Sequence, residues 1–183
     1  DFGLLNLFLS IGNVLVVLSI ADYYYAIVLP KKETDAVALT HISLFLLFVT
    51  TIVVALSVVF AKPISMLFKS PLLAEYYWMM PFYVLIMGAW NVLNYWYIRK
   101  KSFGRISGYQ MSQSVFSAGG KIGLGYAGVL QAGMIYSVVI APCIALVSSM
   151  LLSLKKTLYP LRNVMWRDML QQGKEYRNFP LFV

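Results

Sequence analysis

The chain has 183 residues, of which 60% are hydrophobic and only 12% are charged. Soluble domains carry about 45–50% apolar and about 25% charged residues, so this composition disfavours soluble enzymes, disordered chains and disulfide scaffolds. It indicates a membrane protein. The formal net charge of +8 can be interpreted only once the charges are placed relative to the membrane.

Five apolar stretches are long enough to cross a bilayer as helices, which takes about 20 residues each. They cover about residues 2–29, 37–60, 78–98, 108–128 and 131–154. Pro63 and Pro71, in the connector at residues 61–77, are expected to break any helix there. The last two stretches are joined by a short turn, which favours a helical hairpin. Consecutive apolar residues, as at 14–17, exclude the alternation of barrel strands, so the predicted fold class is an all-α polytopic membrane protein.

The chain begins at Asp1 without a methionine and ends at Val183 within an apolar run that resembles the start of a sixth span. We therefore expect an internal fragment of a longer protein. A polar, basic segment at residues 155–178 precedes that run.

The basic residues predict the orientation. Twelve of the 15 Lys and Arg residues lie in three segments that share one side of a five-span topology, at residues 31–32, 99–105 and 155–177. The opposite side has Lys62 and Lys69, and Lys121 lies within a span. This asymmetry predicts that the basic side is cytoplasmic, and it argues against nucleic-acid binding.

Charged residues inside spans are costly and are therefore candidate site residues. Lys121 could reach the outer interface with its long side chain, or it could line a cavity and attract an anionic substrate. Asp22 could accept a hydrogen bond or a proton in that cavity, pair with Lys121, or be satisfied by a neighbouring helix.

Polar and aromatic side chains within the spans are further candidates. Tyr24, in the run of tyrosines at residues 23–25, could stack on a sugar ring or pack within the protein. Asn91 and Asn94 share a helix face and are expected to bond between helices, with substrate contact as the alternative.

Glycines also recur at a helical spacing. Gly119, Gly123 and Ala127 repeat every four residues, which predicts close helix packing.

The sequence contains no recognisable catalytic motif. The chain has one cysteine, Cys143, and one histidine, and it shows no metal-ligand set and no nucleophile motif. We expect no enzymatic activity and no cofactor, apart from a possible coupling ion.

Three segments resemble a known family. Residues 1–3 open the first span with Asp-Phe-Gly, residues 25–31 read Tyr-Ala-Ile-Val-Leu-Pro-Lys, and residues 174–180 read Lys-Glu-Tyr-Arg-Asn-Phe-Pro. They are similar to bacterial polysaccharide transporters of the O-antigen flippase group, within the multidrug/oligosaccharidyl-lipid/polysaccharide exporter superfamily. The resemblance covers the whole chain as helices two to six.

The resemblance implies a transporter of about 12–14 helices in two lobes, with this chain as most of the amino-terminal lobe. Its implied substrate is a polyprenyl-diphosphate-linked oligosaccharide, moved across the bacterial inner membrane by alternating access for lipopolysaccharide, capsule or exopolysaccharide synthesis. The alternatives are a drug or small-molecule exporter of the same superfamily and a membrane-embedded glycan polymerase. The expected partners are the lipid-linked substrate and the bilayer.

Overall fold

The computed structural model describes residues 2–20, 23–126 and 130–153. Every regular element in these ranges is helical, which confirms the all-α prediction. The long helices are α1 (Phe2–Ile20), α3 (Glu33–Ser57), α6 (Met80–Arg99), α7 (Phe103–Tyr126) and α8 (Leu130–Ser153). The short elements are α2 (Tyr23–Ala26), α4 (Ala61–Leu67), α5 (Leu73–Tyr76) and two 3₁₀ turns, η1 (Val58–Phe60) and η2 (Tyr77–Met79).

Three stretches of the described chain are long and apolar enough to cross a membrane: Phe2–Ser19, Glu33–Leu67 and Gly133–Leu152. They belong to α1, to α3 with its continuation, and to α8. Helices α6 and α7 are 20 and 24 residues long but fall short of the same hydropathy criterion. The chain is therefore a membrane protein, and the five-span topology stays a prediction.

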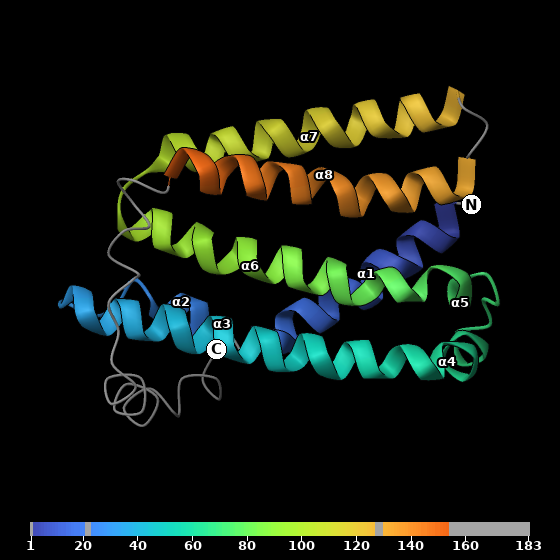
Figure 1. Cartoon of the computed structure of the whole chain (residues 1–183), viewed down its shortest axis with the longest axis horizontal. Helices are drawn as coiled ribbons and strands as arrows, with labels where there is room; N and C mark the ends of the chain where they lie inside the picture. Colours follow the sequence, from blue (N-terminus) through green and yellow to red (C-terminus); the bar gives the residue numbers. More distant parts are fainter. Residues whose placement is uncertain (1, 21–22, 127–129, 154–183) are drawn as a thin grey trace.

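Helix α6 is the centre of the bundle. Figure 1 shows α7, α8, α6 and α3 side by side in that order, with α1 crossing beside α6, and α6 contacts each of the others. Trp96 and Tyr97 of α6 are fully buried, as is Phe8 of α1. The helix begins next to Pro81, which is tolerated in a first turn because its missing N–H would have no helical partner there.

Two glycines let helices approach α6 closely. A Cβ built on Gly12 of α1 would lie 2.5 Å from Cε1 of Tyr83, and one built on Gly88 would lie 2.3 Å from Cδ1 of Leu47 in α3. Both distances are far below van der Waals contact, so any larger residue would push the helices apart. These glycines therefore set the spacing of α1 and α3 against α6.

The expected helix break at Pro63 is wrong. The helical path runs on from α3 through η1 into α4, and Pro63 is the third residue of α4. A proline in the first turn removes an N–H that has no partner within the helix, so it does not end the helix.

The first predicted span is described as far as Ile20 and again from Tyr23, and residues 21 and 22 between them lie outside the described residues. The four-residue α2 is followed by a turn that leads to Pro30. Asp22, the basic segment at 155–178 and the start of the predicted sixth span lie outside the described residues.

Candidate functional site

The described candidates do not gather in one place. Tyr24 lies in α2, which contacts α3 and α6 near the end of the bundle where α6 ends. Lys121 lies in the last two turns of α7, whose carboxyl end is at the opposite end of the bundle (Figure 1).

Tyr24 is packed against other tyrosines. Its ring centroid is 4.3 Å from that of Tyr25 and 5.0 Å from that of Tyr95 in α6, and the residue is only 6% exposed. This burial supports packing as the main role of Tyr24. Tyr25, which is 37% exposed, keeps more ring surface for a ligand.

Arg99, the last residue of α6, holds the turn that follows α2. Its guanidinium donates hydrogen bonds to the carbonyl oxygens of Ile27 (3.2 Å), Val28 (3.4 Å), Pro30 (2.7 Å) and Lys32 (3.2 Å). Carbonyl groups at the end of a helix have no backbone N–H partner. The guanidinium group has several N–H donors in a fixed plane, so it can bond to several of these carbonyl oxygens at once. Next to it, Lys100 forms an ion pair with Glu33 at the start of α3.

We refer to this end of the bundle, where α3 and α7 begin and α6 ends, as the basic end. Arg99, Lys100, Lys101 and Arg105 all belong to it. The role of Arg99 in the fold could not be predicted from the sequence, because its four carbonyl partners lie some 70 positions earlier in the chain.

Within the described residues, the asparagines of α6 make none of the expected interhelical bonds. Asn91 and Asn94 are both half-buried, and neither amide bonds to a described residue. The Oδ1 atom of Asn94 is completely enclosed and has no hydrogen-bond partner in the described part of the chain. Substrate contact by Asn91 stays a prediction.

Lys121 belongs to a polar stripe along α7, which we define as Gln110, Ser114, Ser117 and Lys121. Their spacing of four, three and four residues places them on one helix face. Gln110, Ser114 and Lys121 are exposed, and Ser117 is half-buried. Lys121 forms no ion pair with any described residue. The sequence itself contains this signal, because the four residues repeat with the period of a helix.

The glycines near Lys121 overturn a prediction. Gly119 and Gly123 are exposed, and a Cβ built on either would meet no neighbouring atom within 4 Å in the described part of the chain. The close approach between α7 and α8 is made instead by Gly120, whose Cβ would lie 2.9 Å from Oγ of Ser137, and by Gly133. Ala127 lies outside the described residues. Close packing of a glycine in α7 therefore exists as expected, but it involves Gly120 and not Gly119 or Gly123.

A lipid-facing surface would not suit the polar stripe. A lysine near a helix end can extend to the interface, but the glutamine and serine side chains of the stripe would find no partners in hydrocarbon. The stripe therefore belongs against water or against another polar protein surface. Together with the apolar helices, it defines the class of molecule as a membrane protein in which one helix carries a polar stripe.

The comparison with known families agrees with this class. A family model described as "polysaccharide biosynthesis protein" matches residues 1–179. No curated protein and no solved structure matches the chain. Because the match covers nearly its whole length, the chain belongs to the polysaccharide biosynthesis protein family.

Proposed function

We propose that this protein translocates a polyprenyl-diphosphate-linked oligosaccharide across the bacterial inner membrane by alternating access. The family supports a role in polysaccharide biosynthesis. The observation that carries the transport step is the polar stripe of α7, because a helix that turns glutamine, serine and lysine outward inside a membrane protein suits a water-filled path.

In this proposal the chain is a multi-pass lobe of five spans, and the basic end is cytoplasmic. Lys121 attracts the diphosphate, and the hydroxyl and amide groups of the stripe replace water around the sugar. Transport does not require these residues to make or break a covalent bond. We therefore propose no catalysis and no metal for them. We assign none of these residues to the binding of a coupling ion.

The test uses cells that lack the full-length gene and carry it back on a plasmid. Without the gene, completed lipid-linked oligosaccharide is expected to accumulate in the cytoplasmic leaflet, and the restored gene should clear it. Absence of completed units would point to an earlier synthetic step and so to an enzyme. An unchanged lipid pool would point to export of small molecules.

Lys121→Ala tests the site itself. Loss of one cation beside an anionic group is worth about 1 kcal/mol, so we expect export to fall roughly fivefold at equal protein abundance. Lys62→Ala removes the same charge from exposed α4 and serves as the control. Normal export by Lys121→Ala would remove this lysine from the proposed path.

A further inference from the structure

The end of the bundle opposite the basic end carries a short helix with an uncovered apolar face. Helix α4 lies there together with α5 (Figure 1). It follows α3 through η1. We refer to residues 58–69, from the start of η1 to the second residue after α4, as the end segment.

Helix α3 does not need the end segment in order to cross a membrane. A helix rises about 1.5 Å per residue, so the 25 residues of α3 alone cover about 37 Å. The hydrocarbon core of a bilayer is about 30 Å thick. The backbone also leaves α-helical geometry at Phe60, where φ is −98° and ψ is 19°, so α3 and α4 do not form one straight rod. When α3 spans the bilayer, the end segment therefore lies at the membrane surface.

The two sides of α4 differ in exposure. On the inner side, Ser65 is buried and Ile64 is half-buried. Pro63, Met66 and Leu67 have the spacing i, i+3 and i+4, so they share the outer face, where Met66 is 72% and Leu67 80% exposed. The exposed large apolar residues of the whole end segment are Val59, Phe60, Met66, Leu67 and Phe68. Exposed apolar side chains clustered in this way mark a contact with a membrane or with another protein.

The charges of the end segment are all positive. Lys62 and Lys69 are exposed, and residues 58–69 contain no Asp or Glu. Neither lysine forms an ion pair with a described residue. Lys62 precedes Met66 by four residues and so borders the apolar face, where its aliphatic stem can cover apolar surface while its ammonium group reaches a polar one. An apolar face bordered by lysines fits the boundary between acyl chains and phosphate headgroups.

The apolar surface of the end segment is continuous with that of α3. Val53, Leu56 and Phe60 follow one another at three- and four-residue spacing, and all three are exposed. The surface that α3 presents to its surroundings therefore extends to the end segment without a polar break. Lipid is the one occupant that would cover both.

We propose that the end segment is an interfacial anchor. It inserts its apolar face into the lipid leaflet opposite the basic end and places Lys62 and Lys69 at the lipid phosphates. The apolar face carries the insertion, so loss of one lysine alone, as in Lys62→Ala, leaves the anchor in place. This assignment does not depend on the identity of the transported substrate.

The test is electron paramagnetic resonance of the spin-labelled full-length protein in vesicles of phosphatidylethanolamine and phosphatidylglycerol. All cysteines are first replaced, and a nitroxide is attached at Leu67→Cys. Its collisions with oxygen, which concentrates in the bilayer, are compared with its collisions with a water-soluble nickel complex. Glu75→Cys is the matched control, because Glu75 is an exposed residue of α5 at the same end. The oxygen-to-nickel ratio should be at least about threefold higher at position 67 than at position 75.

A smaller difference between the two positions would show that the outer face of α4 meets water, and it would overturn the anchor. Low collision rates with both reagents at position 67 would show that another part of the protein covers this face, with the same consequence.

The role of the lysines is tested in the same assay. The double variant Lys62→Glu/Lys69→Glu should lower the oxygen-to-nickel ratio at position 67 by about twofold or more, because the lipid phosphates then repel the end segment. An unchanged ratio would remove both lysines from the headgroup region and would also overturn the proposal.

Discussion

Helices α3 and α7 are almost equal in length, at 25 and 24 residues, but they turn very different surfaces outward. The exposed side of α3 consists of large apolar residues: Leu44, Phe45, Phe48, Val49, Ile52, Val53 and Leu56. The exposed side of α7 mixes apolar residues with the polar stripe. One surface suits lipid and the other does not.

The hydroxyl groups of the two helices show the same difference. In α3, Thr40, Ser43 and Thr51 each donate to the carbonyl oxygen four residues earlier, at 2.8–2.9 Å. A serine or threonine satisfied in this way can remain in an apolar environment. In α7, Ser114 and Ser117 make no hydrogen bond to a described residue. Their hydroxyls remain available to water or to a ligand.

The largest expected effect comes from placing a charge on each surface. Phe48→Lys would put an ammonium group on the outward face of α3, at a cost of about 2.5–3.5 kcal/mol if that face meets hydrocarbon. Ser114→Lys, equally near the middle of α7, should cost less than about 1 kcal/mol. The two variants are compared by their abundance in the membrane fraction. Equal loss of both proteins would contradict the difference between the surfaces.

The basic end, where both helices begin, is stabilised by Arg99. Arg99→Gln should lower the free energy of unfolding by about 1.5–3 kcal/mol, because several carbonyls lose a charged donor. Lys100→Gln breaks the partly exposed pair with Glu33 and the cation–π contact with Trp96, whose ring centroid lies 5.2 Å from Nζ, and should cost about 1 kcal/mol. Thermal unfolding in detergent, followed by circular dichroism, measures both. A smaller loss for Arg99→Gln than for Lys100→Gln would show that the turn after α2 does not depend on Arg99.

The glycines offer a matched pair of substitutions. Gly88→Ala drives a methyl group into Leu47, which is 1% exposed and cannot swing away, so we expect a loss of about 1–3 kcal/mol. Gly119→Ala meets open space and should be neutral or stabilise the helix by up to about 1 kcal/mol. The same unfolding assay applies. Loss of stability in Gly119→Ala would return this glycine to a packed interface.

The smallest effect is expected at the turn between α6 and α7. Lys101 has φ of 53°, in the left-handed region that favours glycine. Lys101→Gly should therefore stabilise the protein, by about 0.5–1 kcal/mol at most. The measurement is the midpoint of thermal unfolding, and a lower midpoint would mean that the lysine side chain contributes more than the backbone conformation costs.

Much of the fold could be predicted because hydropathy acts locally. The all-α class follows from stretches of apolar residues long enough to span a bilayer, and the two separate helices α7 and α8 follow from the length of residues 108–154. The effect of Pro63 on the helix could not be predicted in the same way, because it depends on the position of the proline within the helix, and residue propensity does not give that position.

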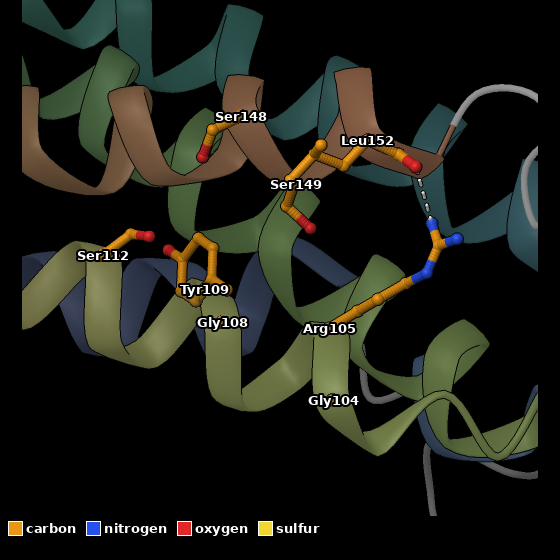
Figure 2. A pocket seen from close by; sticks show the side chains of 8 residues that line it. All are labelled: Gly104, Arg105, Gly108, Tyr109, Ser112, Ser148, Ser149 and Leu152. Carbon is orange, nitrogen blue, oxygen red and sulfur yellow. Dashed lines mark hydrogen bonds between the residues drawn. The ribbon is translucent and has the colours of Figure 1, made fainter.

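The faces of the helices could not be predicted in the same way. The spacing of Gly119 and Gly123 fits a packed helix face and an exposed one equally well, and the choice depends on Ser137 and Gly133 of α8. The cavity between α7 and α8 that Gly104, Tyr109 and Ser149 line (Figure 2) could not be predicted either, because its walls come from residues about 40 positions apart. The spacing of residues along the sequence does not show which of these distant residues come into contact.

The most direct test of the account is the water accessibility of α3 and α7. Cys143 is the single cysteine of this chain, so Cys143→Ala, with any cysteine elsewhere in the full-length protein also replaced, gives a background without thiols into which Ser114→Cys or Phe48→Cys can be introduced. With the full-length protein in membranes, a membrane-impermeant maleimide should label the cysteine at position 114 and not the one at position 48. Failure to label position 114, or equal labelling of both, would contradict the claim that the polar stripe lines a water-filled path.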